Sequence, residues 1–146
     1  MDRGLAVVLT AIVGGFIALQ APINSQLGRA VGTTQGAFVS FAIGTVLLLG
    51  IAMVAGGLGD LGEVRHVEWY YLLGGVLGAA YVTTALVTVR SLGAGGVTAA
   101  TIAGQLTASV VVDQLGILGV SKHPLTAARV AGIALLAAGV YLVVRD

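Results

Sequence analysis

The chain has 146 residues, of which 58% are hydrophobic and only 9% are charged, with a mean hydropathy of +1.04. Soluble domains carry about 25% charged residues, and a chain this small has too little polar surface to cover helices that are apolar on every side. The formal net charge of +1 and the lack of Cys exclude a basic nucleic-acid-binding surface, a disulfide framework and a thiolate metal site. Composition therefore predicts a small all-α membrane protein, with the lipid bilayer as its surroundings.

Five apolar segments have the length of a transmembrane helix, which needs about 20 residues to cross a hydrocarbon core roughly 30 Å thick. In chain order they are residues 5–26, 34–56, 69–89, 95–118 and 126–144. The longest connection, residues 57–68, is polar and is predicted to be a solvated loop. The chain is thus predicted to be one polytopic domain, residues 1–146, with five membrane-spanning helices and no linker.

The positive charges that flank these segments are divided almost evenly between the two sides of the membrane. Four cations fall on the side of the N-terminus and three on the other side: Arg3, Arg65, Lys122 and Arg129 against Arg29, Arg90 and Arg145. A bias in Lys and Arg normally fixes orientation. The near-equal division predicts a chain that inserts both ways up and assembles with an inverted copy of itself.

The first segment carries two amide side chains in its second half. Gln20 and Asn24 are four residues apart and so share a helix face. Pro22, between them, has no N–H and leaves the carbonyl of Ala18 without its helical partner. Two interpretations stay open: the amides bind a ligand, or they hydrogen-bond neighbouring helices and hold the bundle together, each contributing about 0.6 to 2 kcal/mol.

The third segment opens with an aromatic cluster typical of a membrane interface, and then places Tyr81 and Thr84 on one helix face deeper in the membrane. Tyr81 lies near the middle of the segment, where its hydroxyl needs a partner. The fourth segment has the most polar face in the chain, with Thr101, Gln105, Ser109 and Asp113 at four-residue steps. Together with Gln20 and Asn24, the residues Tyr81, Thr84, Gln105 and Ser109 are predicted to line a substrate cavity.

Asp113 is the one acidic residue inside a predicted span, and an ionisable group in the membrane is a functional-site hypothesis by default. Two roles are open. It can pair with Lys122 or Arg129 on the same side, since an acid near the C-terminal end of a helix opposes the helix dipole unless a cation is close. It can instead take up a proton for a coupled carrier, because removal from water disfavours the charged carboxylate.

Glycine is abundant, with 23 residues, most of them inside the spans. Between helices in lipid, close backbone approach at small residues replaces the attraction that water drives elsewhere. Four-residue spacings of small residues occur in the second to fifth segments. In the last segment, Ala128, Gly132 and Gly139 are predicted to pack against a second copy in the dimer.

Nothing in the sequence indicates catalysis. Phosphate loops, catalytic triads and paired intramembrane carboxylates are missing, and the two His residues have no metal-ligand spacing, so neither an enzyme activity nor a metal or cofactor is predicted.

Several strings resemble the YdcZ-like family of the drug/metabolite transporter superfamily, which consists of small bacterial membrane proteins. They are ALQAPINSQLG from residue 18, SFAIGT from 40, GGVLGAAYV from 74, GQLTASVVVDQLGILG from 104 and RVAGIALLAAGVYLV from 129. The resemblance implies one five-helix half of an inverted-repeat transporter, placed in the bacterial inner membrane. It also implies an antiparallel dimer, made with an inverted copy or with an oppositely oriented sister chain. Small multidrug-resistance relatives use a carboxylate in the first helix, where this chain has amides.

The favoured interpretation is a secondary transporter or exporter of a small metabolite or drug-like compound that works by alternating access between inverted copies. The alternative is a non-transporting membrane subunit that modifies a partner protein. A passive pore ranks lowest, because no ring of charge and no repeated carbonyl filter is visible.

Overall fold

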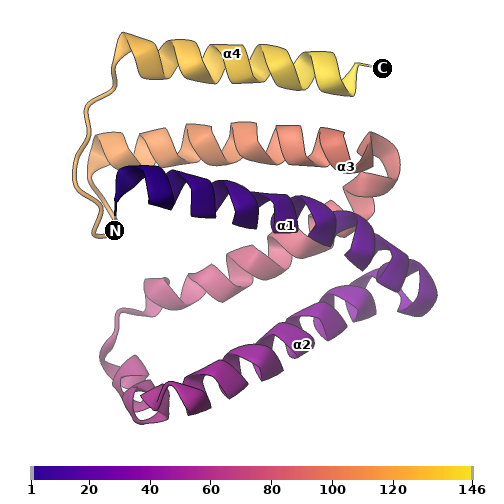
Figure 1. Cartoon of the computed structure of the whole chain (residues 1–146), viewed down its shortest axis with the longest axis vertical. Coiled ribbons are helices and arrows are strands. Elements are labelled where there is room, and N and C mark those ends of the chain that lie inside the picture. The colour runs from indigo at the N-terminus through magenta and orange to yellow at the C-terminus, as the bar shows by residue number, and fades with distance from the viewer. Residues whose placement is uncertain (1, 146) are drawn as a thin grey trace. The chain divides into compact units, whose positions relative to one another are not determined.

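The computed structural model describes residues 2–145 and is all-helical over that range, which confirms the predicted all-α class (Figure 1). Its four α-helices are α1 (Arg3–Val31), α2 (Thr33–Val54), α3 (Leu73–Leu115) and α4 (Ala127–Val144). Two 3-10 helices, η1 (Gly57–His66) and η2 (Trp69–Leu72), lie between α2 and α3. All four α-helices are long and apolar enough to cross a membrane.

The helix α1 runs five residues past the expected end at residue 26, and Pro22 lies inside it without ending it. In a membrane a Pro is tolerated within a helix because neighbouring groups can satisfy the freed carbonyl. The helix stops at Gly32, whose φ of 100° and ψ of 149° reverse the chain at once into α2. A side chain disfavours such a positive φ, so Gly is suited to this one-residue connection.

The connection of residues 57–68 is more regular than the loop predicted for it. Most of it forms the 3-10 helix η1, which begins after Gly56 at a φ of 74°. No residue of η1 or η2 is buried. The local helical turns satisfy backbone groups with little help from tertiary contacts, so the segment is solvated as expected although it is not irregular.

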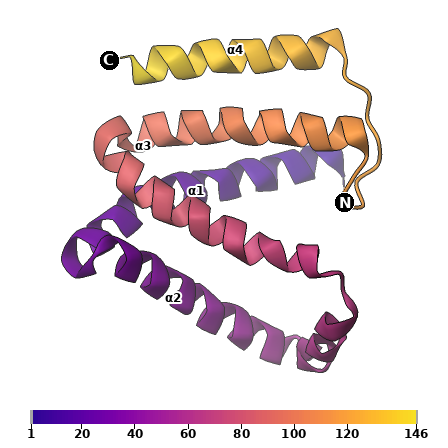
Figure 2. The same cartoon turned by 180° about the vertical axis from the view of Figure 1, so that it is seen from behind.

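The helix α3 contains two of the five predicted spans. Its backbone leaves helical geometry at Gly93, with a φ of 67° and a ψ of 171°. Figures 1 and 2 draw α3 from opposite sides. The break falls in the gap between the expected spans 69–89 and 95–118. The second part ends at Leu115, three residues earlier than expected, because Gly116 adopts a φ of 64° and Leu118 one of 59°.

The chain divides into two compact units by its internal contacts. One unit comprises residues 1–18 and 91–146, and the other comprises residues 19–90, so α1 and α3 each contribute to both. The unit of residues 19–90, named here the central unit, contains α2 whole. The other is named the terminal unit and contains α4 whole.

In the terminal unit, the second part of α3 and α4 form an antiparallel helical hairpin. At one end, a Cβ added at Gly96 would lie 3.5 Å from Cγ2 of Val144. At the other end, the backbone N–H of His123 donates to the carbonyl of Asp113 at 2.8 Å. The helix α4 begins at Ala127 after the cap residue Thr126, whose hydroxyl accepts from the N–H of Arg129 at 3.3 Å.

Few side chains are buried in the described residues, and long stretches of Leu, Val, Ile and Phe are exposed along every α-helix. For α4, none of the 18-residue apolar window is buried. Such a surface would aggregate in water, whereas a bilayer solvates it at no cost. The exposed apolar surface therefore agrees with a membrane-embedded protein.

Candidate functional site

One face of α1, named here the seam, consists of small and polar residues that are buried in the core of the central unit. Ala21, Asn24, Ser25 and Gly28 are buried and recur at spacings of three and four residues, which places them on one helix face. From the first part of α3, the buried residues of this unit are Val82, Ala85 and Leu86. From α2 they are Gly36 and Ala37.

The three helices meet most closely at Gly28. A Cβ added at Gly36 would lie 2.8 Å from Cα of Gly28, so the two backbones are in direct contact. A Cβ added at Gly28 would lie 2.6 Å from Cδ2 of Leu86, and Leu86 is the one large side chain in residues 2–145 with no exposed surface. Gly36 belongs to a four-residue spacing of small residues in the second segment, which was predicted to be a contact face, whereas Gly28 and Leu86 were not predicted.

One turn before Gly28, the seam becomes polar. Asn24 is 6% exposed and Ser25 is 5% exposed, and Nε of Arg90 donates to Oγ of Ser25 at 3.3 Å. The Nδ2 atom of Asn24 is fully buried and has no hydrogen-bond partner within the described residues. A buried donor without an acceptor is costly, and a native structure normally supplies one from protein, water or ligand.

The other cavity residues predicted in the central unit are less enclosed. Gln20 is exposed although it lies one turn from Asn24 and its neighbour Ala21 is buried. Tyr81 is half-buried and Thr84 is exposed. The Ser25–Arg90 contact was not predicted, because Arg90 was counted only among the positive charges that flank the apolar segments.

In the terminal unit, the predicted polar face of α3 is largely uncovered. Gln105 and Ser109 are exposed, while Thr101 and Asp113 are half-buried. Exposed amide and hydroxyl groups at membrane depth are unfavourable in contact with lipid tails. These two side chains therefore need contact with water or with protein outside this helical hairpin.

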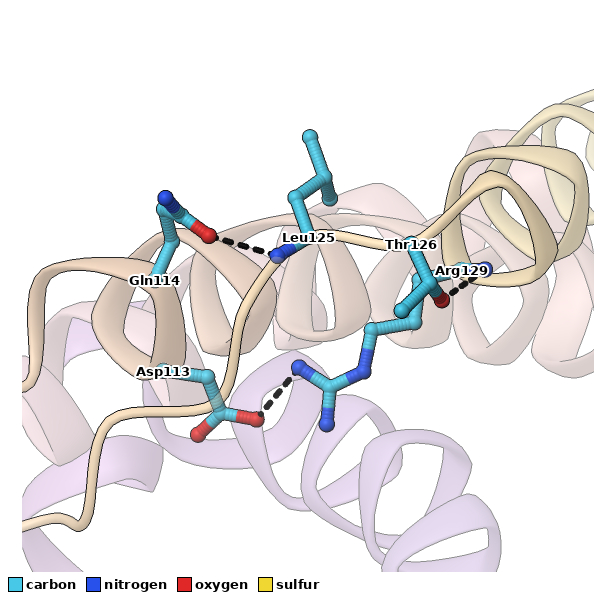
Figure 3. Close-up of polar contacts among 5 residues, drawn as sticks. All are labelled: Asp113, Gln114, Leu125, Thr126 and Arg129. Atoms are coloured by element: carbon cyan, nitrogen blue, oxygen red, sulfur yellow. Dashed lines mark hydrogen bonds and ion pairs between the residues drawn. The ribbon is translucent and has the colours of Figure 1, made fainter.

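Asp113 forms an ion pair with Arg129, one of the two partners proposed for it from the sequence (Figure 3). The Oδ2 atom of Asp113 accepts from Nη1 of Arg129 at 3.0 Å, and the side chains are 25% and 34% exposed. Asp113 lies in the last turn of α3 and Arg129 in the first turn of α4, so each charge opposes the dipole of its own helix. Pairing offsets both unfavourable placements.

A side-chain amide makes a second contact at the same end of the hairpin. The Oε1 atom of Gln114 accepts a hydrogen bond from the backbone N–H of Leu125 (Figure 3). Lys122, the other candidate partner of Asp113, packs its side chain against Gly116. Two side-chain contacts from adjacent residues of α3 thus fix the connection that leads into α4.

A cavity of about 430 Å³ lies between the second part of α3 and α4. Its lining is apolar apart from Thr107 and Gln114. Thr107 donates to the carbonyl of Ala103 and Gln114 accepts from Leu125, so both polar groups are already engaged. None of the residues predicted to bind substrate lines this cavity, and an apolar groove on a membrane helix pair has the character of a helix-packing or lipid-facing surface.

The predicted dimer-packing residues of α4 make little contact inside the chain. A Cβ added at Gly132 or at Gly139 would meet nothing within 4 Å, and Ala128 is exposed.

The family model described as "Putative inner membrane exporter, YdcZ" matches residues 5–142, which is all of the chain except four residues at each end. The chain belongs to the YdcZ family. The resemblance stated from the sequence strings is thereby confirmed. No curated protein and no solved structure gives a significant match.

Membership of the YdcZ family places the chain in the inner membrane as a multi-pass protein, as predicted, and the four membrane-capable helices agree with this. It also supports a transporter role, since the family is described as one of exporters and not of enzymes. Within residues 2–145, no group of three or more His, Cys, Asp and Glu side chains could hold a metal ion. The candidate site of this YdcZ-family chain consists of polar helix faces.

Proposed function

We propose that the chain exports a small metabolite or drug-like compound by alternating access, as an antiparallel dimer in which two copies lie in opposite orientations. The observation that carries the proposal is the family match over residues 5–142. The described residues form four membrane-capable helices, and we count α3, which is broken at Gly93, as two of five spans. An odd number of spans with no second half requires another chain to complete an inverted-repeat transporter. The substrate path in this proposal is lined by Gln20, Asn24, Tyr81, Thr84, Gln105 and Ser109.

The exposure of Gln105 and Ser109 supports this proposal. Side chains that lie on a helix face at membrane depth and are not covered by their own hairpin are suited to a water-filled path. In the antiparallel pair, each copy contributes the same residues, so the path carries every polar group twice.

Transport by the purified chain tests the function directly. Vesicles that contain only this protein should show saturable counterflow of a substrate, chosen by a thermal-shift screen in which ligand binding stabilises the fold. A non-transporting subunit gives no counterflow, and a passive pore gives flux that does not saturate. Either of those results contradicts the proposed export function.

The near-equal division of positive charge predicts dual topology. A reporter fused to the C-terminus should be found on both sides of the inner membrane, and two added Lys at the N-terminus should move nearly all of it to one side. The check uses paired reporters, one active only in the cytoplasm and one only outside it. A single location for the unmodified chain contradicts the homodimeric antiparallel arrangement and leaves a pair of sister chains.

The open faces of Gly132 and Gly139 predict that α4 contributes to the dimer. We expect Gly132→Leu to weaken the dimer, because helices in lipid associate through close approach at small residues. Inside the chain itself, a Cβ added at Gly132 meets nothing within 4 Å. Dimerisation is measured by single-molecule capture in vesicles over a range of protein-to-lipid ratios.

Gly15→Leu is a matched control, since Gly15 also has open space and lies on α1. A Gly132→Leu dimer that is as strong as that of the Gly15→Leu control shows that α4 packs elsewhere.

A further inference from the structure

The polar end of the seam in the central unit has an excess of hydrogen-bond donors. Nδ2 of Asn24 is buried with no acceptor, and Oγ of Ser25 already accepts from Arg90, which leaves its own hydrogen to donate. The guanidinium of Arg90 has further N–H groups beyond the Nε that contacts Ser25. Three side chains therefore offer donors at one place without a matching acceptor.

The three side chains lie at the same level of the contact between α1 and α3. Along α1, Gly28 contacts Leu86, and Ser25, three residues earlier, contacts Arg90, four residues after Leu86. Asn24 directly precedes Ser25 and is buried on the same face of α1. The crossing at Gly28 thus brings the Arg90 guanidinium to the Ser25 hydroxyl, and the buried amide of Asn24 belongs to the residue next to Ser25 along α1.

Within residues 2–145, no carboxylate pairs with the positive charge at this place. Within residues 2–145, the one ion pair joins Asp113 and Arg129 and does not involve Arg90. The acidic residues of the central unit, Asp60, Glu63 and Glu68, all lie in the connection between α2 and α3, away from the end at which α1 meets α2. Arg29 adds a second cation in the last turn of α1.

We propose that Asn24, Ser25 and Arg90 form a binding site for an oxyanion, a carboxylate or phosphate group. A planar guanidinium binds such a group through paired N–H donors, and hydrogen bonds to an ionised acceptor are roughly twice as strong as neutral ones. The oxyanion supplies the acceptor that Nδ2 of Asn24 lacks and the negative charge that Arg90 lacks. Asn24 also lies in the proposed substrate path, so the inference rests on the proposed function. It implies that the exported compound carries an acidic group.

The test uses the full chain purified in an uncharged, phosphate-free detergent, with thermal unfolding as the readout. The probes are benzoate, inorganic phosphate and, as the uncharged match of benzoate, benzamide. We expect benzoate or phosphate to raise the unfolding temperature in a saturable way and benzamide to leave it unchanged. A separate arm adds phosphatidylglycerol to the micelles, because a lipid headgroup offers the same phosphate chemistry.

Three variants test which side chains bind the anion. Asn24→Leu and Arg90→Gln should each weaken the apparent affinity for the anion by at least about tenfold, since each removes donors to a charged ligand. Arg29→Gln removes a cation from the same end of α1 without touching the seam, and should weaken it by less than about threefold. Arg90 is exposed, so its substitution leaves the fold intact even where Asn24→Leu changes packing.

If only phosphatidylglycerol stabilises the protein, and Asn24→Leu and Arg90→Gln each abolish that stabilisation, the oxyanion site stands and its ligand is a lipid headgroup. No stabilisation by any of the three anionic probes overturns the site, and so does equal stabilisation of wild type and Arg90→Gln. Counterflow separates this from the proposed function. If the anion binds and the substitutions at the site weaken its binding, but no counterflow is seen, the oxyanion site stands and the export function is wrong. If Arg90→Gln transports uncharged compounds, the export function stands and the oxyanion site is wrong.

Discussion

Gly36→Ala should destabilise the protein by about 1–3 kcal/mol, and Gly36→Leu by more, because overpacking a close contact forces the backbone to move. The added Cβ would lie 2.8 Å from Cα and 2.9 Å from N of Gly28. Both of those atoms belong to backbone, so no side-chain rotation relieves the contact and α1 and α2 must separate. The measurement is the midpoint of thermal unfolding of the purified protein in detergent.

Two glycines of the same region serve as controls. Gly44 lies on the same helix, and a Cβ there meets nothing within 4 Å, so Gly44→Ala should be neutral or more stable by up to about 1 kcal/mol from helix propensity. Gly28→Ala should be intermediate, because its nearest neighbour is the movable end of the Leu86 side chain. If Gly36→Ala is as stable as Gly44→Ala, the two backbones are not in contact at Gly28.

The helices themselves follow from the sequence because hydrocarbon thickness and apolar run length determine them. Five expected spans appear in α1 to α4, with two of them joined across Gly93. The ends were less accurate, and for definite reasons. Pro22 was tolerated and α1 continued to Val31, while Gly116 ended α3 before residue 118.

The pairing of helices was harder to predict, because it depends on which small residue meets which. A four-residue spacing identified Gly36, but its contact with Gly28 is set by the one-residue turn at Gly32. Asn24 was predicted to be a site residue from its chemistry, whereas Ser25 and Arg90 were not, since neither a Ser in a helix nor a cation at a helix end is unusual. The crossing of α1 and α3 brings Ser25 and Arg90 together, and Asn24 is buried next to Ser25 along α1.

The second substitution with a large expected effect on stability breaks the Asp113–Arg129 ion pair of the terminal unit. Removing one partner of a buried ion pair costs about 3–5 kcal/mol, and exposed pairs contribute about 0–1 kcal/mol. With Asp113 25% exposed and Arg129 34% exposed, we expect Asp113→Arg to lose an intermediate amount, roughly 2 kcal/mol, since it places two guanidinium groups together. The double variant with Asp113→Arg and Arg129→Asp should recover that loss.

Recovery should be complete or better, because the exchanged charges suit their helices. An Arg at position 113 lies in the last turn of α3 and an Asp at position 129 in the first turn of α4, which are the placements that the helix dipoles favour by about 0.3–1 kcal/mol each. The exchange also keeps the number of cations on that side of the membrane, so topology is not altered. A double-mutant cycle on unfolding midpoints measures the coupling.

The matched control combines Asp113→Arg with Lys122→Asp, which has the same net charge but changes a residue that does not pair with Asp113. It should remain as unstable as Asp113→Arg alone, and recovery there would show that nearby charge and not the specific pair matters. The exchanged protein also separates the two roles of Asp113, since it holds the hairpin without a carboxyl at position 113. We expect its transport to keep the pH dependence of the wild type, because the carboxylate is occupied by Arg129 in the hairpin. A stable exchanged protein that has lost only pH-driven uptake instead identifies Asp113 as the coupling acid.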